Sequence, residues 1–460
     1  MSNSPWRAIL TGRTARILAV GLPALLYLGF LLATLPAVPF HPDEATYIFM
    51  SRDVDRILTL GPLSVCWQAG GNSDPLQVER ERDCPLTRYS IGLARLAGGL
   101  PPTDSNWNWS ADWEQNLRQG AVPADELLVL SRIPEALLLF FAVLCMARIG
   151  WRLGGAVGAV SAGLLFGLNS QILLHGRRAM SESALLFGMI LIVTVLLEQR
   201  KNAGRIFRVV GLPCLVGAAL AVAVSAKHSG LLMAPVAVAG MFLADRESSP
   251  RKILLRGGIR TGVMILAFLA VFLAFNPVYW CDPLGTLSAV AAERQRLLGE
   301  QVQAMRSAAP MSVLDSFPLR LLAALYEWVM APPAFWDIPN YAGITAAAEK
   351  TYLAQPLNAL TAGGIGYVLF FILALFGLGW TAARCLRREA DTSWIIAPIW
   401  FLSVFAGIVA GVPILWQRYY LPLLPAGAAL SAMAVAAIVG RISRLAKEST
   451  SKREKDNRQD

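Results

Sequence analysis

Residues 16–47 have the sequence RILAVGLPALLYLGFLLATLPAVPFHPDEATY, in which a long apolar run leads to the acidic pair Asp43-Glu44. The run, about residues 16–37, has the length of roughly 20 residues that a helix needs to cross a bilayer. It is too long for a cleaved signal peptide and has no small-residue cleavage pattern, so we expect it to stay as an anchor. Carboxylates directly after such a run are costly to hold near lipid and mark a functional site by default. The stretch therefore predicts a membrane protein with chemistry at the membrane surface.

The composition of the whole chain supports this prediction. Of 460 residues, 55% are hydrophobic and 16% are charged, and the mean hydropathy is +0.50, whereas about a quarter of the residues of soluble domains are charged. About ten apolar runs approach the length of a spanning helix. They lie at about 16–37, 127–147, 155–173, 180–197, 209–226, 229–244, 261–275, 362–382, 394–413 and 420–440. We expect an all-α polytopic membrane protein, with residues 1–445 as a single transmembrane domain.

The basic residues predict the topology, because short cytoplasmic loops collect Lys and Arg. Clusters occur near the N-terminus, at about 148–152, 200–208, 246–260 and 384–388, and from Arg441 to Arg458. About ten spans place all of them on one side, so both termini are expected in the cytoplasm. The net charge of +10 then needs no nucleic acid to explain it. The tail, residues 446–460, is expected to be disordered, and the lack of an obvious eukaryotic sorting signal favours a bacterial inner membrane.

Two segments on the external side, about 38–126 and 276–360, are too long to be simple connectors. Their tryptophans suit short amphipathic helices at the headgroup level, and we favour this interpretation over sugar stacking. Leu319–Met330 is a candidate for one more short span or half of a re-entrant pair, which would bring the total to about 11–12. Cys66 and Cys84 are candidates for a disulfide in an oxidising compartment, with Cys281 as a competing partner.

The ionisable residues at the external ends of the spans gather on one side of the membrane. They are His41, Asp43, Glu44, His175, Arg177, Arg178, Glu182, Lys227, His228 and Arg418. A sheltered carboxylate can take a proton from an acceptor hydroxyl or amine near neutral pH, and Asp43 is the candidate for this base. Arg178, Lys227 and Arg418 are candidates for holding a phosphate or pyrophosphate leaving group, whose negative charge they would stabilise.

A divalent metal cation is a further candidate cofactor. Its ligands would come from His41, His175, Glu44 and Glu182, although no tight ligand spacing supports the site. Simpler roles also fit single residues, since Lys227 near a helix end suits a side chain that snorkels to the interface. Two adjacent acids just beyond a span add little to anchoring or packing, so a functional role for this pair is favoured.

Several motifs follow one another along the chain. They are Phe40-His41-Pro42-Asp43-Glu44-Ala45-Thr46-Tyr47, Pro85-Leu86-Thr87-Arg88-Tyr89-Ser90-Ile91-Gly92, Ser131-Arg132-Ile133-Pro134, His175-Gly176-Arg177-Arg178-Ala179-Met180-Ser181-Glu182 and Gln417-Arg418-Tyr419-Tyr420-Leu421-Pro422. In their order and sidedness they resemble the GT-C superfamily of glycosyltransferases that use polyprenyl-phosphate sugars. The protein O-mannosyltransferases and the lipid A aminoarabinose transferase are the most similar branches. The resemblance covers most of the chain.

The resemblance implies roles for individual residues. Asp43 would be the general base, with Glu44 beside it in the catalytic motif, and Glu182 would be the second acidic residue, where family members often carry Asp. The lipid-phosphate pocket would contain Arg88, Arg178, Lys227, Arg418 and Tyr419. The implied fold is a GT-C helix bundle whose two large external loops carry short amphipathic helices.

The activity implied is transfer of a sugar, with inversion, from an undecaprenyl- or dolichyl-type phosphate donor. The acceptor on the external face would be a protein, a lipid or a glycan, and that face would be the periplasm or the exterior of the cell. A polyprenyl-linked glycan polymerase or ligase is the nearer alternative. A lipid-sugar flippase or secondary transporter is the more distant one, because such proteins usually show internal repeats and mid-membrane ionisable residues.

Overall fold

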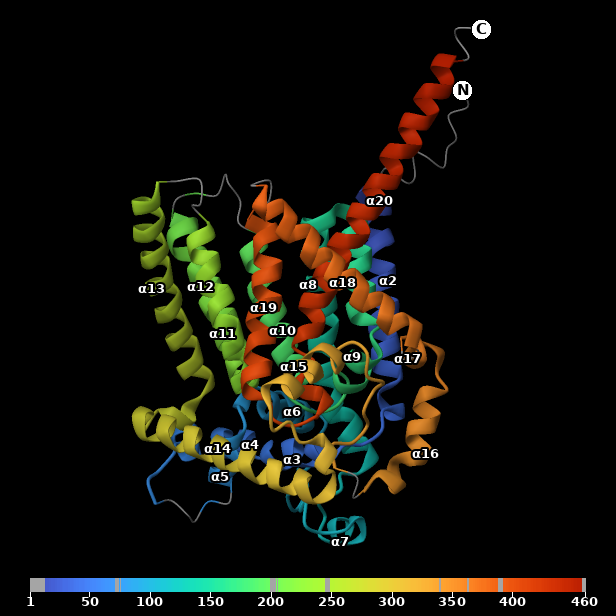
Figure 1. Cartoon of the computed structure of the whole chain (residues 1–460). Coiled ribbons are helices and arrows are strands. Elements are labelled where there is room, and N and C mark those ends of the chain that lie inside the picture. The colour runs from blue at the N-terminus through green and yellow to red at the C-terminus, as the bar shows by residue number, and fades with distance from the viewer. Residues whose placement is uncertain are drawn as a thin grey trace.

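The computed structural model describes residues 13–70, 74, 76–198, 204, 206–244, 249–338, 341–361, 364–387 and 392–456. Within these ranges the regular elements are helices, and an isolated β-bridge pairs Val313 with Ile414. The expected all-α fold is therefore confirmed. Upright helices form a bundle, and shorter helices gather at one end of it, around α14 (Figure 1).

The apolar runs of the sequence coincide with helices of the bundle. These are α2 (Arg13–Ala33), α8 (Asp125–Gly167), α10 (Glu182–Leu197), α11 (Leu212–Ala226), α12 (Ala234–Leu243), α13 (Pro250–Phe275), α18 (Gly364–Leu386), α19 (Thr392–Gly411) and α20 (Leu423–Asp456). Among the described residues, 6 helical segments are long and apolar enough to cross a membrane. Shorter apolar helices include Gly21–Ala33, Glu182–Leu197 and His228–Leu243. The chain is thus an integral membrane protein.

Helix α8 contains a sharp reversal that accounts for two of the predicted runs. Gly155 has a φ of 63°, a conformation that favours glycine, and Gly154 is also non-helical. The turns on either side pack tightly, since a Cβ on Gly150 would lie 2.1 Å from the carbonyl oxygen of Gly158. The runs 127–147 and 155–173 therefore begin on the two arms of one helical hairpin, and the second ends in α9 (Ser170–His175).

Helix α10 lies at the centre of the bundle, and most of its side chains are buried. It packs closely against α11, because Gly188 brings the two backbones together: a Cβ there would lie 2.6 Å from the Cα of Ala223. Small residues allow such close approach between membrane helices, where dispersion contacts supply much of the packing energy. The first residue of α10 is Glu182, so this central helix carries a predicted site residue to the end of the bundle.

The two external segments contain the shorter helices. The first has α3 (Pro42–Met50), α4 (Asp53–Leu60), α5 (Leu76–Arg82), α6 (Pro85–Ala97) and α7 (Trp113–Arg118), and the second has α14 (Pro283–Ala308), α15 (Phe317–Tyr326), α16 (Ala342–Leu353) and α17 (Pro356–Ala359). Helix α14 lies across the end of the bundle (Figure 1). With 10 residues, α15 is too short to span a bilayer.

A disulfide between Cys66 and Cys281 joins the two external segments, with 5.7 Å between the Cα atoms. The expected Cys66–Cys84 bridge is therefore wrong, and the competing partner Cys281 is correct. Cys84 is a buried free thiol. Beside the disulfide, the backbone N–H of Trp67 donates to the carbonyl of Val278 at 3.0 Å, so the two segments also share a backbone contact.

The described ends of α2 and α20 lie at the end of the bundle opposite the short helices (Figure 1). Helix α20 continues to Asp456, so residues 446–456 are helical where disorder was expected, and the rest of that predicted tail, 457–460, lies outside the described residues. The alanine- and lysine-containing sequence after the last span has good intrinsic helix propensity and extends the helix beyond the bundle.

Candidate active site

The acidic motif begins helix α3. His41 is the N-cap, Pro42 occupies the first turn, and the Asp43 backbone N–H donates to the Nδ1 atom of His41 at 3.2 Å. The Glu44 carboxylate in turn accepts from the His41 backbone N–H at 3.0 Å, which completes a capping box. Proline in the first turn matches the fixed φ of a helix start. The local sequence thus fixes the direction in which Asp43 leaves the helix.

Glu44 holds this motif against the bundle. Its carboxylate accepts from Arg132 at 2.7 and 2.8 Å and from the backbone N–H of Ala179 at 2.8 Å, and its exposed fraction is 0%. Burial opposes ionisation, but the charge and hydrogen bonds of Arg132 hold the pKa of Glu44 below its ordinary value. Both oxygens are occupied and neither faces solvent, so a catalytic role for Glu44 does not fit its position. It is a positioning residue.

Asp43 lies in a different environment, in an ion pair with Arg418. The other terminal nitrogen of Arg418 lies 2.9 Å from Asp337, and the Nε2 atom of His41 is 3.3 Å from the same Asp337 oxygen. Burial opposes the charge of Asp337, but Arg418 and then His41 hold its pKa well below the ordinary value. Residues from α3, the second external segment and the turn before α20 therefore meet at one point.

Asp337 was not predicted from the sequence. It lies in an irregular stretch after α15, in the tetrapeptide Phe335-Trp336-Asp337-Ile338, which has no periodicity or motif to single it out. A lone acid in a long external segment resembles ordinary solvated charge. Only the chain fold, which places the stretch against His41 and Arg418, shows its role.

Two further predicted site residues, Glu182 and Lys227, form an acid–cation contact, with 2.8 Å between the carboxylate and Nζ. Lys227 Nζ also lies 5.4 Å from the centroid of the Tyr419 ring, within the range of a cation–π interaction. The guanidinium of Arg418 lies 5.6 Å from the same ring. Tyr419 thus lies between the two cations, and its hydroxyl donates to Gln301 on α14 at 3.3 Å.

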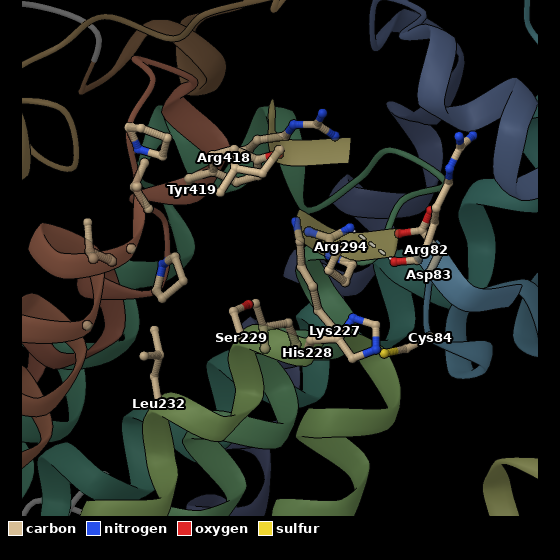
Figure 2. A pocket seen from close by; sticks show the side chains of 18 of the residues that line it. Arg82, Asp83, Cys84, Lys227, His228, Ser229, Leu232, Arg294, Arg418 and Tyr419 are labelled. Carbon is tan, nitrogen blue, oxygen red and sulfur yellow. Dashed lines mark hydrogen bonds between the residues drawn. The ribbon is translucent and has the colours of Figure 1, made fainter. Parts of the chain in front are cut away.

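A cavity of about 360 Å³ opens beside these cations (Figure 2). Its polar wall contains Arg82, Asp83, Lys227, His228, Arg294, Arg418 and Tyr419. Its apolar wall contains Leu185, Leu232, Leu298, Ile408, Val412 and Pro413. The cavity therefore combines a cluster of cations with a hydrophobic side formed by membrane helices, which suits a ligand with an anionic group on an apolar chain.

Arg294 is a further lining residue that sequence reasoning missed. It projects from α14 toward Lys227 (Figure 2), and its guanidinium donates to the Arg82 carbonyl at 3.0 Å. In the sequence it lies within Glu293-Arg294-Gln295-Arg296, a charged helical stretch typical of a solvated surface. Nothing in that pattern distinguishes it from Arg296, which pairs with Glu293 and Glu300 instead.

Two predicted phosphate ligands do not line the cavity. Arg88 is 1% exposed and bonds to the Asp83 carbonyl at 2.7 Å, with Asp53 3.5 Å away. Arg178 is 0% exposed and donates to the carbonyls of Pro39 and Phe335 at 3.2 and 2.7 Å. Both guanidiniums therefore hold backbone segments together, and their expected role in the phosphate pocket does not fit their positions.

The expected metal ligands are not assembled as a set. His175 Nε2 lies 3.4 Å from the Gln417 amide oxygen, and burial lowers the pKa of His175 to about 3, so its ring is neutral. Among the described residues, no group of three or more His, Cys, Asp or Glu side chains could hold a metal ion. The nearby carboxylates are instead neutralised by Arg or Lys. The donor set does not fit a divalent metal as arranged here.

The chain matches no protein-family model and no curated protein sequence. Its fold is similar to solved structures. ArnT from Cupriavidus metallidurans, bound to undecaprenyl phosphate, has a TM-score of 0.52 and 14% identity, covering 92% of this chain and 60% of that one. The oligosaccharyltransferase of Archaeoglobus fulgidus, in complex with Zn and sulfate, has a TM-score of 0.51 and 14% identity, covering 91% of this chain and 49% of that one. The chain spans about half to three fifths of the length of these proteins and has a similar fold.

Proposed function

We propose that this protein transfers a sugar from a polyprenyl-phosphate donor to an acceptor at the end of the bundle that carries α3 and α14. The observation that carries the proposal is the cavity with a cationic wall and an apolar wall, directly beside the Arg418–Asp43 pair. A similar structure binds undecaprenyl phosphate, a ligand with the same two chemical parts. The fold alone would not specify this ligand.

The donor phosphate would lie against Lys227, Arg294 and Arg418, which line the cavity together. Arginine offers paired donors in a fixed plane and lysine a compact point charge, so the set suits a tetrahedral anion. The isoprenoid chain would follow the apolar wall formed by Leu232, Ile408 and their neighbours. The cations would stabilise the negative charge that develops on the phosphate as the sugar leaves it.

Asp43 would act as the general base. It accepts the proton of the acceptor group while the acceptor oxygen or nitrogen forms a bond to the anomeric carbon of the sugar. The bond from that carbon to the phosphate oxygen breaks, and its electron pair leaves with the polyprenyl phosphate. A single displacement of this kind inverts the anomeric centre. Asp43 suits the role because, with 20% of its side chain exposed, it stays open to an acceptor, whereas Glu44 is enclosed.

The proposed location is a bacterial inner membrane, with the site facing the periplasm and both termini in the cytoplasm. The disulfide between Cys66 and Cys281 supports an oxidising compartment at the end of the bundle that carries the site. The opposite end carries the N-terminus of α2 and the end of α20 (Figure 1), in agreement with the basic clusters on that side.

Arg294→Met tests the donor site, with Arg296→Met on the same helix as the matched control. In nanodiscs, release of polyprenyl phosphate is measured over a panel of polyprenyl-phosphate sugars and candidate acceptors. Loss of one charged contact should raise the KM for the donor by about tenfold or more. Arg296→Met should behave as wild type, because Arg296 pairs with Glu293 and Glu300. Equal donor KM values in the two variants, or a wild type that releases no carrier, would contradict the proposal.

A further inference from the structure

Arg418 connects the cavity to the candidate base. It lines the cavity, and its two terminal nitrogens bind different carboxylates, Asp43 and Asp337. Its guanidinium lies 5.2 Å from the ring centroid of Trp416 and 5.6 Å from that of Tyr419. The Nε atom of Arg418 is buried and has no hydrogen-bond partner among the residues that the structure describes. The guanidinium is therefore held in place but retains a donor that none of these residues uses.

The two carboxylates on Arg418 differ in how firmly they are fixed. The side chain of Asp337 is 6% exposed and also contacts His41 Nε2 at 3.3 Å. The side chain of Asp43 is 20% exposed. Within the described residues, its carboxylate has an ion pair with Arg418 and none with a second cation. Solvent and ligands can reach Asp43 more easily, so its contact with Arg418 is the one that another anion can replace.

This contact also masks the base that the proposed function requires. The guanidinium of Arg418 lies against one carboxylate oxygen of Asp43 and keeps an acceptor group away from that oxygen. A phosphate has several acceptor oxygens and can accept two parallel hydrogen bonds from one edge of a guanidinium. A phosphate at the guanidinium of Arg418 and the Asp43 carboxylate thus compete for the same positive charge, and Asp43 is the more exposed of the two carboxylates that hold it.

On the basis of the proposed function, we propose that the donor phosphate displaces Asp43 from Arg418 and thereby releases the base. Asp337 keeps the guanidinium in place during the exchange. Without donor, Asp43 is held as the counter-ion of Arg418. With donor bound, Asp43 is free to accept the acceptor's proton. Binding of the donor therefore precedes activation of the acceptor. Arg418 is the residue through which the donor phosphate controls the availability of Asp43.

The test measures the affinity of the full chain in nanodiscs for undecaprenyl phosphate. Removal of the competing charge by Asp43→Asn should tighten binding by about tenfold, the scale of one charge-assisted hydrogen bond. The control is Asp315→Asn, because Asp315 pairs with Arg306 in the second external segment and does not line the cavity. If only the net charge mattered, Asp315→Asn would tighten binding as much. We expect a change of about twofold or less for Asp315→Asn, below roughly 0.4 kcal/mol.

A double-mutant cycle isolates the role of Arg418. The tightening caused by Asp43→Asn should disappear in an Arg418→Gln background. Carbodiimide labelling of wild type supplies a measurement that needs no variant. Undecaprenyl phosphate should increase modification of Asp43, mapped by mass spectrometry, and leave that of the exposed Asp315 unchanged.

Unchanged or weaker binding by Asp43→Asn, equal tightening by Asp315→Asn, or a tightening that persists with Arg418→Gln would overturn the inference. So would labelling of Asp43 that stays constant or falls when the lipid is added. These outcomes leave the proposed function standing if wild type binds the lipid and releases the carrier. A wild type that does neither would remove both proposals.

Discussion

The Glu44–Arg132 pair shows how a charge can be buried at the head of a membrane bundle. Arg132 also donates to the carbonyls of Leu35 and Val38 at 2.8 and 2.9 Å, so it joins the end of the first span to α3. Removal of one partner leaves the other charge buried and unpaired, which is strongly destabilising, whereas the intact pair adds little net stability. The pair therefore sets the position of the site more than it stabilises the fold.

Arg132→Met should lower the free energy of unfolding by about 3–5 kcal/mol, because Glu44 would be left without its counter-ion. Thermal unfolding in detergent, followed by tryptophan fluorescence, measures the change. Arg296→Met removes an ion pair that is half exposed and should shift stability by less than about 1 kcal/mol. Similar unfolding temperatures for Arg132→Met and wild type would show that the pair does not have this role.

At the residue level, the sequence predicted which charges gather but not all of their partners. Asp43 meets Arg418, and Glu182 meets Lys227, at the end of the bundle where they were expected. Asp337 and Arg294 were missed because their neighbourhoods consist of ordinary loop and surface residues. The partners of a charge depend on contacts between distant segments, and a single sequence does not contain those distances.

At the level of elements, the disulfide holds the second external segment where the cavity needs it. Cys281 directly precedes α14, which carries Arg294, while Cys66 follows α4. The bond closes a long loop, because Cys66 and Cys281 are 215 positions apart in the sequence. It should therefore limit the conformational freedom of the unfolded chain. The hydrophobic runs could be assigned to helices from local sequence, but the choice between Cys84 and Cys281 required the fold.

Reduction of the disulfide should lower the stability of wild type by about 2–4 kcal/mol. Thermal unfolding with and without dithiothreitol gives the effect, and Cys281→Ser should match reduced wild type and be insensitive to reductant. Cys385→Ser is the control, because Cys385 is a free cysteine on α18. A wild type whose unfolding is unaffected by reductant, with the bond shown to be open by mass, would argue against this role.

At the level of the whole molecule, the fold places all the chemistry at one end. The helices that could cross a membrane form the frame, and the site lies where α3, the start of α10, α14 and the turn before α20 converge (Figure 1). The sequence predicted this sidedness because basic loops and external acids separate along the chain. The bundle geometry, with the reversal at Gly155 and the close α10–α11 contact, depends on glycine positions whose meaning is visible only in three dimensions.

The most direct measurement of the central claim compares wild type with Asp43→Asn in nanodiscs. It follows the release of polyprenyl phosphate from polyprenyl-phosphate sugars in the presence of candidate acceptors. Loss of a general base should reduce turnover by about a hundredfold or more, while the variant stays folded and still binds the lipid. Asp315→Asn, which removes a carboxylate outside the cavity, should retain turnover within about threefold, or roughly 0.7 kcal/mol. A fully active Asp43→Asn, or a wild type that moves lipid across vesicles but turns over no sugar carrier, would contradict the account.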